Sequence, residues 1–218
     1  MANRLVFIVE GDCEEYLVNQ KIIPYLYLQV PAGVSWTMNV QKITTNRKLH
    51  ARGGNVSYAY LEADIRRTSK QNGGNTYITT FLDYFRLPND FPGYQTQNID
   101  LIEEAMRHDL PEIKLIPYIQ KYEFETLLFS SKDALSFVID SPSGMNDIER
   151  ILDQFPNVED INGGSETAPS KRLAHIFPYN KVIDSMLVLD MVEMSVILDK
   201  CPRFSGWIAK LVHLVSNE

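Results

Sequence analysis

The arrangement of the apolar segments constrains the fold of this chain more than any other feature. The run LVFIV at residues 5–9 and the run TYITTFLDYF at residues 76–85 are rich in β-branched and aromatic residues, without a strict polar alternation. Such runs are typical of strands buried on both faces, as in parallel sheets. A third apolar run, IKLIPYIQ, occupies residues 113–120. We therefore expect three buried strands in the first two thirds of the chain.

Segments with helical patterns separate these strands. The chain is predicted to alternate strand and helix throughout its first part, which favours a three-layer α/β sandwich with a mostly parallel central sheet. A further, half-exposed strand is predicted at residues 36–43, followed by a polar, basic loop at residues 44–56. The predicted helices cover residues 14–28, with a kink or break at Pro24, residues 57–71 and residues 98–108.

The remainder of the chain, residues 131–218, has a mainly helical pattern. We expect an α/β core at residues 1–130 and a helical C-terminal extension at residues 131–218, packed on the core as one structural domain. The only cysteines are Cys13 and Cys201, which form neither a disulfide framework nor a CxxC metal pair and fit a reducing compartment. No apolar run is long enough for a membrane span, and no signal-peptide pattern begins the chain, so we expect a cytoplasmic protein.

Acidic side chains follow each of the three buried strands. Glu10 comes directly after the first strand, Asp83 lies near the end of the second, and Glu123 and Glu125 follow the third. Because the carboxyl ends of parallel strands meet at one edge of a sheet, we expect all four carboxylates to face one small volume. Ligand sites of open α/β sheets lie at this edge.

Carboxylates crowded together repel one another unless a cation lies between them. Mg²⁺ or Mn²⁺ is the hard, oxygen-seeking ion that fits such a group, and two such ions can flank a phosphate during hydrolysis. Glu10 would then serve as a metal ligand or as the general base. The alternative is structural: acids commonly end strands and begin helices, and the YEFE segment at residues 122–125 would turn its glutamates to solvent.

Basic residues that could contact phosphate fall in two places. Arg47 and Arg52 lie in the glycine-containing loop, and Lys171 and Arg172 begin a helix that Ser170 is predicted to cap. The alternative for both places is a solvated loop or a loop-to-helix junction. The formal net charge of −7 argues against a broad basic face for duplex binding. No GxGxxG or Walker lysine motif is present, so no built-in ATPase is expected.

These segments resemble known families. FIVEGDCEEYLV is similar to the VEGxTE start of Toprim domains, the metal-binding modules of topoisomerases, primases and OLD-type nucleases. Four longer blocks resemble the prokaryotic family called domain of unknown function 4276. The blocks are VEGDCEEYLVNQKIIPYL, TTFLDYFRLPNDFPGY, IPYIQKYEFETLLFSS, and INGGSETAPSKRL with CPRFSGWIAKL.

The resemblance implies a Toprim-like fold, in which Glu10 corresponds to the glutamate of the first motif and Asp83 to the first aspartate of the DxD motif. Phe85 stands where the second aspartate would be, so Glu123 or Glu125 would have to replace that ligand. Genes of the family's relatives often lie beside ATPase genes in defence-type gene sets. The resemblance therefore also implies a partner ATPase.

Two hypotheses of function follow from the sequence. The first is Mg²⁺-dependent phosphodiester hydrolysis by a nuclease or nuclease subunit, with nucleic acid as substrate. The second is a noncatalytic Toprim-like module that binds a partner ATPase or a nucleotide. Hydrolysis of phosphate monoesters or nucleotides at the same carboxylates is a third option.

Overall fold

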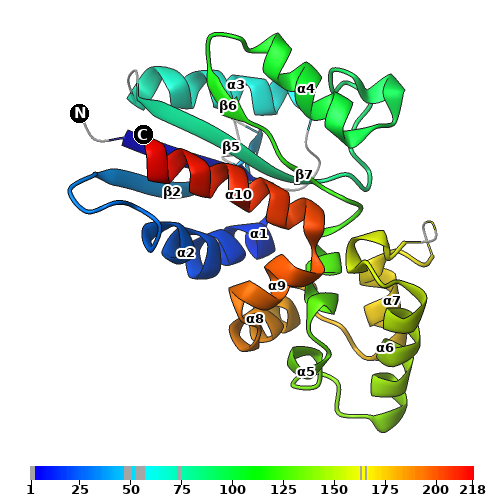
Figure 1. Ribbon diagram of the computed structural model, residues 1–218. Coiled ribbons are helices and arrows are strands. Elements are labelled where there is room, and N and C mark those ends of the chain that lie inside the picture. Colours follow the sequence, from blue (N-terminus) through cyan, green and yellow to red (C-terminus); the bar gives the residue numbers. More distant parts are fainter. Residues whose placement is uncertain (1–2, 47–50, 53–56, 73–74, 163, 165) are drawn as a thin grey trace. The chain divides into compact units, whose positions relative to one another are not determined.

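The structure is a computed structural model, which describes residues 3–46, 51–52, 57–72, 75–162, 164 and 166–218 (Figure 1). It divides into two compact units. The first comprises residues 1–119 with residues 210–218, and the second comprises residues 120–209. The predicted division at residue 130 stays a prediction.

The first unit is built on a parallel sheet, as the sequence predicts. β1 (Asn3–Val9) lies between β2 (Trp36–Lys42) and β5 (Thr76–Asp83), and β6 (Lys114–Ile116) extends the sheet beyond β5. All three of these strand pairings are parallel. The α/β expectation is therefore confirmed.

Helices cover both faces of this sheet (Figure 1). On one face, Ile8 and Ile78 belong to an apolar cluster with Leu61 of α3 (Tyr58–Asn72) and Ile102 of α4 (Ile99–Asp109). The alternate residues of β1, including the fully buried Phe7, point to the opposite face. The elements of that face are α1 (Asp12–Leu17), η1 (Val18–Ile22), α2 (Ile23–Tyr27) and residues 210–217 of α10 (Pro202–Asn217).

The predicted kink at Pro24 takes the form of a π-helical segment. Proline has no N–H to donate to the preceding turn. The N–H of Ile23 is bonded to the carbonyl of Val18, five residues back, so the helix widens directly before the proline and continues into α2. The helix also begins earlier than predicted, at Asp12, because the Glu14 carboxylate accepts the Gly11 N–H at 2.9 Å.

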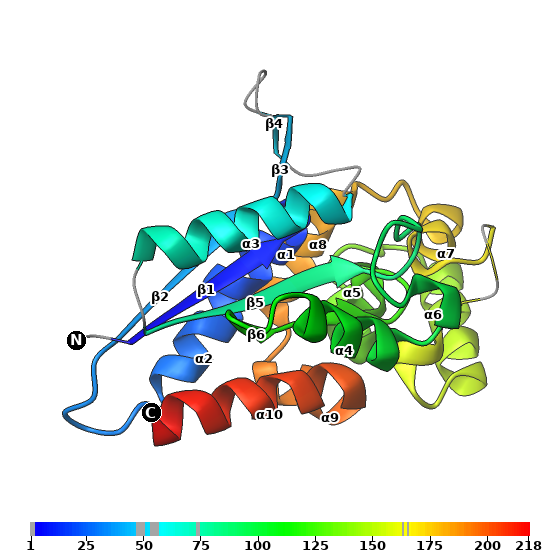
Figure 2. The same cartoon turned by 90° about the horizontal axis from the view of Figure 1, so that it is seen from above.

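Two further expectations needed correction. The segment predicted as a loop contains a short antiparallel pair, β3 (Thr44–Asn46) and β4 (Ala51–Arg52), which projects away from the sheet (Figure 2). The predicted strand at residues 113–120 is two strands, β6 and β7 (Ile119–Gln120), with Pro117 between them. Proline cannot donate to a ladder, and there the buried Thr80 hydroxyl bonds both the N–H and the carbonyl of Tyr118, at 2.9 and 3.0 Å.

The second unit is helical, as expected for this part of the chain. Its centre is η3 (Phe124–Ser130), a 3₁₀ segment whose residues are all buried. Around it pack α5 (Lys132–Leu135), η4 (Val158–Asp160), α7 (Pro169–Ile176), α8 (Lys181–Met191) and α9 (Met194–Lys200). α6 (Pro142–Gln154) and the first half of α10 complete the unit. Among the described residues, no helix is both long and apolar enough to cross a bilayer.

Candidate functional site

The first unit brings Glu10 and Asp83 together at the carboxyl edge of the sheet. β1 and β5 pair in parallel with Val9 opposite Phe81, and the Glu10 N–H continues this ladder to the Phe81 carbonyl at 3.2 Å. The Asp83 N–H donates to Oε2 of Glu10 at 3.3 Å. Asp83 is buried and Glu10 is partly buried. Two acidic residues that are 73 positions apart in the sequence are thus neighbours because of strand register.

The acids that follow Glu10 have structural contacts of their own. Glu14 is buried and forms the capping box of α1 with Gly11. Asp12 and Glu15 both lie near the ammonium of Lys42, at 2.5 and 3.3 Å. Their place in the first turn of α1 agrees with the preference of helix N-termini for negative charge.

In the second unit, the Glu123 carboxylate accepts hydrogen bonds from the first turn of α7. Its Oε2 accepts the backbone N–H of Ser170 at 3.0 Å, and its Oε1 accepts the Ser170 hydroxyl at 3.1 Å. Ser170 follows Pro169, the first residue of α7, so it lies inside the first turn and is not the cap that the sequence predicts. The carboxylate therefore satisfies a backbone donor that the helix itself leaves without an acceptor.

Glu125 is fully buried, with 0% of its side chain exposed. The ammonium of Lys181, the first residue of α8, lies 3.2 Å from Oε1 and 3.4 Å from Oε2. The Tyr179 hydroxyl donates to Oε1 at 3.4 Å and is also bonded to the Ser185 hydroxyl at 2.8 Å. Burial raises the pKa of Glu125, with a smaller contribution from the charge of Glu123, while Lys181 opposes the rise. The solvent-facing alternative for the YEFE glutamates does not occur, since both are buried.

In the second unit, Glu159 is a third buried glutamate, which the sequence analysis missed. Its two oxygens accept the backbone N–H groups of Arg203 and Phe204 at 2.6 and 3.1 Å, at the start of α10. Burial raises its pKa, and these two hydrogen bonds oppose the rise. No local pattern could have found this contact, because the carboxylate and its donors lie 44 and 45 positions apart.

The structure therefore describes two pairs of the predicted acids, Glu10 with Asp83 in the first unit and Glu123 with Glu125 in the second. Within the described part of the chain, no group of three or more His, Cys, Asp or Glu side chains is arranged to hold a metal ion. The convergence of all four carboxylates stays a prediction.

The predicted phosphate contacts have different outcomes. Arg47 lies outside the described residues, and Arg52 is described only by its backbone pairing with Thr44. Lys171 is exposed in the first turn of α7. Arg172 is partly buried, with its Nε donating to the Thr167 carbonyl at 2.8 Å, and its guanidinium lies 5.2 Å from the centre of the Phe155 ring.

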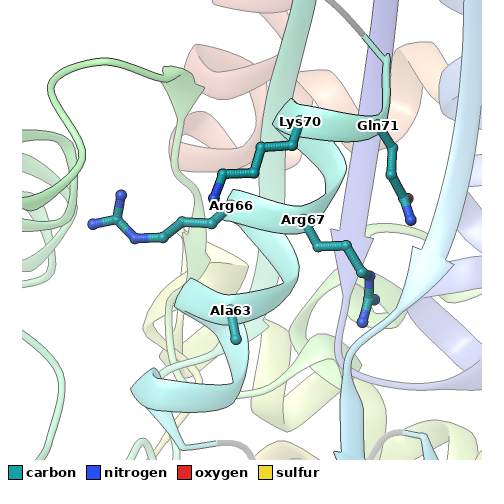
Figure 3. Close-up of a pocket in the computed structure, with 5 residues that line it drawn as sticks. All are labelled: Ala63, Arg66, Arg67, Lys70 and Gln71. Carbon is teal, nitrogen blue, oxygen red and sulfur yellow. The ribbon is translucent and has the colours of Figure 1, made fainter.

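A basic hollow on α3 was not foreseen. It is lined by Ala63, Arg66, Arg67, Lys70 and Gln71, which share one side of the helix. Figure 3 shows Arg66 and Lys70 leaving the helix in one direction and Arg67 and Gln71 in another. The signal was present in the sequence as three cations within five residues of a predicted helix.

Carboxylates neighbour both arginines of the hollow. Arg66 is paired with Glu62 and Glu112, while Nη2 of Arg67 lies 2.8 Å from Oδ1 of the buried Asp64. In the part of the chain that the structure describes, no carboxylate pairs with the remaining cation, the exposed Lys70. The hollow therefore offers one lysine and two oriented guanidinium groups to an anion, which would compete with these carboxylates for the arginines.

Two solved structures have folds similar to that of this chain. The structure of the C-terminal region of the OLD protein of Xanthomonas campestris pv. campestris, phased with mercury, aligns with a TM-score of 0.50 at 13% identity, over 99% of this chain and 95% of that one. The structure of the same region phased with iodine gives a TM-score of 0.47 at 12% identity, over 98% and 96% of the two chains. No curated protein matches the sequence. The expected Toprim-like fold is therefore confirmed.

A family-level sequence match also covers most of the chain. The model of the family described as Domain of unknown function (DUF4276) matches residues 9–212. This range holds the four carboxylates at the predicted strand ends and the helices of the second unit. The chain therefore belongs to the DUF4276 family.

Proposed function

We propose that this Toprim-like protein is a Mg²⁺- or Mn²⁺-dependent phosphodiesterase, acting on nucleic acid as a nuclease or nuclease subunit. The observation that carries the proposal is the pairing of Glu10 with Asp83 at the carboxyl edge of a parallel sheet, where α/β folds place their ligands. The resemblance of the first motif to the Toprim VEGxTE sequence supports the same two residues.

The donor set suits such an ion. Glu10 and Asp83 offer carboxylate oxygens, which are the hard ligands that Mg²⁺ and Mn²⁺ prefer. When bound, the ion would supply charge stabilisation at the phosphate and a more acidic water. Glu10 would hold the ion or accept the proton of the attacking water, and Asp83 would hold the ion. Glu123 and Glu125 remain proposed additional ligands, each of which would first have to exchange a contact within the second unit.

Several cations are proposed to contact the phosphate backbone of the substrate. Arg47, Arg52, Lys171 and Arg172 retain this role as a proposal from the sequence. The hollow on α3 adds Lys70 to the candidates, because it is exposed and lies beside two oriented guanidinium groups.

The alternative is a noncatalytic module that binds a partner ATPase or a nucleotide. Two observations favour it: Phe85 replaces the second aspartate of the DxD motif, and the carboxylates of Glu123 and Glu125 are engaged with Ser170 and Lys181. Calorimetric titration with Mg²⁺ and Mn²⁺ separates the two functions. Binding that is lost in the Glu10→Gln variant supports the enzyme, and no binding supports the module.

The decisive experiment substitutes the paired carboxylates. Glu10→Gln and Asp83→Asn should each lower Mn²⁺-dependent cleavage of plasmid, single-stranded DNA or RNA at least about a hundredfold. Each should lower the free energy of unfolding by no more than about 1 kcal/mol, because both substitutions are isosteric and leave an oxygen on residue 10 to accept the Asp83 N–H. Glu104→Gln, on the exposed side of α4, is the control. Full cleavage in both variants would refute the mechanism.

A further inference from the structure

The basic hollow on α3 lies beside the strands of the sheet and not at their carboxyl ends. The buried Asp64 accepts the N–H of Thr44 at 2.7 Å, just beyond the end of β2, so it marks the level of the carboxyl edge. Thr68, one turn further along α3, accepts a hydrogen bond from Gln41, which lies within β2. Lys70 comes next, closer to the end of α3, so the helix runs back toward the amino ends of the strands.

A phosphate group in the hollow would be distinct from one held at the carboxyl edge by Glu10. Glu10 is level with Ile43, since the Ile43 N–H donates at 3.0 Å to the carbonyl just before Glu10. Lys70 lies beyond Asp64 on α3, by about 9 Å along the helix axis. The hollow also faces away from the sheet, because the opposite side of α3 packs into the apolar cluster. With a helix diameter of about 10 Å, Lys70 and the carboxyl edge are separated by on the order of 15 Å.

The two arginines of the hollow keep donors for an anion. The buried carboxylate of Asp64 holds Nη2 of Arg67 at 2.8 Å, which directs the guanidinium but uses only part of its five N–H donors. Arg66 is paired with Glu62 and Glu112, whose side chains are 34% and 56% exposed. Exposed ion pairs of this kind contribute little to stability, so a phosphate can take the place of either glutamate at small cost.

Lys70 and Gln71 complete the hollow at one end, and Ala63 lies at the other (Figure 3). Lys70 and Gln71 are exposed, and in the described residues no carboxylate pairs with this lysine. The hollow has a volume of about 470 Å³, which is within the range of sites that hold small ligands. An ammonium, an amide and two planar guanidinium groups are donors that suit phosphate oxygens.

We propose that the α3 hollow binds a backbone phosphate of a nucleic-acid strand away from the carboxyl edge, so that the substrate is a polymer and not a mononucleotide. The inference rests on the proposed function in one respect, that a phosphodiester is the group that reaches Glu10 and Asp83. Nucleotides of one duplex strand rise about 3.4 Å each, so a separation on the order of 15 Å corresponds to about four or five nucleotides. The hollow would hold one phosphate of the strand while another lies at the carboxylates.

The test measures binding of fluorescein-labelled single-stranded DNA and RNA of about 20 nucleotides, which exceeds this separation. Fluorescence anisotropy is recorded with the full chain in EDTA, so that no metal-dependent cleavage occurs. Lys70→Glu should weaken binding at least about tenfold and reduce the slope of log K against log salt by about 1, because a phosphate contact is lost. Lys210→Glu is the matched control, since Lys210 is exposed on α10 and the change in net charge is the same. If Lys70→Glu does not fold, Lys70→Gln replaces it.

Glu112→Gln should act in the opposite direction. It removes a carboxylate that competes with the strand for Arg66, so binding should tighten by about two- to fivefold. Glu104→Gln is its control, because Glu104 is exposed on α4 and the change in charge is equal. A gain limited to Glu112→Gln assigns the effect to the hollow, since loss of structure would weaken binding.

Equal binding by Lys70→Glu and the unmodified protein, or no binding by the unmodified protein, would overturn the proposal. A loss confined to a fluorescent nucleoside triphosphate, titrated in parallel, would also overturn it, because the hollow would then be a mononucleotide site. Cleavage assays separate this inference from the proposed function. A protein that binds the strand through Lys70 and never cleaves it refutes the nuclease and sustains the hollow. Cleavage that is lost in Glu10→Gln, together with unchanged binding in Lys70→Glu, does the reverse.

Discussion

The contact between Glu159 and the start of α10 should stabilise the second unit measurably. The first residue of this helix, Pro202, has no N–H, and the next two N–H groups both point to the Glu159 carboxylate. A helix leaves these donors without partners of its own. Glu159→Ala removes the acceptor, and the N–H of Phe204 at least would remain buried.

The size of the loss follows from these two bonds. An unsatisfied buried donor costs about 1–3 kcal/mol, and the Arg203 donor is only partly buried. Removing a desolvated charge returns part of this loss, because burial raises the pKa of Glu159. We expect Glu159→Ala to lower the free energy of unfolding by about 2–4 kcal/mol, and its melting temperature by several degrees.

Glu159→Gln separates the acceptor from the charge. Glutamine keeps one carbonyl oxygen for the helix start and carries no charge, so its stability at pH 7 should lie within about 1 kcal/mol of the unmodified protein. The raised pKa means that the folded protein holds this proton more tightly than the unfolded chain. The stability from this group is therefore complete below the ordinary value of 4.5 and declines as the pH rises through the folded-state pKa. The glutamine variant should lack that decline.

Urea unfolding followed by circular dichroism at several pH values measures both effects. The two units call for a check that unfolding is a single transition. Glu149→Gln is the control, because Glu149 is 52% exposed and pairs with Lys132 on the surface. The reasoning would be refuted by an alanine variant as stable as the unmodified protein, or by an unchanged pH dependence in Glu159→Gln.

Two further predictions concern the first unit. Gly93→Ala should lower the free energy of unfolding by more than about 1 kcal/mol, since φ is +77° and a Cβ would lie 3.1 Å from the Leu101 carbonyl. Gly33→Ala, at φ +87° with no atom near the added carbon, should cost less, and equal losses would contradict the steric argument. Thr80→Val should cost about 1–3 kcal/mol in chemical unfolding, because it removes the hydroxyl that bonds both backbone groups of Tyr118; a loss below about 0.5 kcal/mol would show that those bonds contribute little.

The parallel sheet and the place of Glu10 could be predicted because they depend on short-range patterns. A run such as LVFIV specifies a buried strand by composition, and the direction of parallel strands determines which ends meet. The same rule placed Asp83 beside Glu10, where the structure has it. The break at Pro117 was foreseeable from the missing N–H, whereas the substitute bonds of Thr80 were not, since they join residues 38 positions apart.

The surroundings of the other glutamates could not be predicted in this way. Glu123, Glu125 and Glu159 are each satisfied by the first turn of a different helix, from 44 to 56 positions further along the chain. Such contacts depend on how the helices of the second unit pack. Sequence patterns predict acids at strand ends or in the first turn of their own helix. They do not predict a carboxylate that accepts hydrogen bonds from the first turn of a helix far away in the sequence.

The helix contacts of Glu123 and Glu125 decide which substitutions can test the proposed catalytic role of the acids. Replacing Glu123 or Glu125 removes a contact with Ser170 or Lys181, so a loss of activity in those variants would confound altered packing with a lost ligand. The Asp83 N–H donates to Glu10 beside two strands that pair in regular register, and the isosteric variants Glu10→Gln and Asp83→Asn keep that donor and an acceptor, so they should disturb packing less. Cleavage by Glu10→Gln and Asp83→Asn therefore weighs more than any result on the second pair. The second pair is better tested by metal binding than by cleavage.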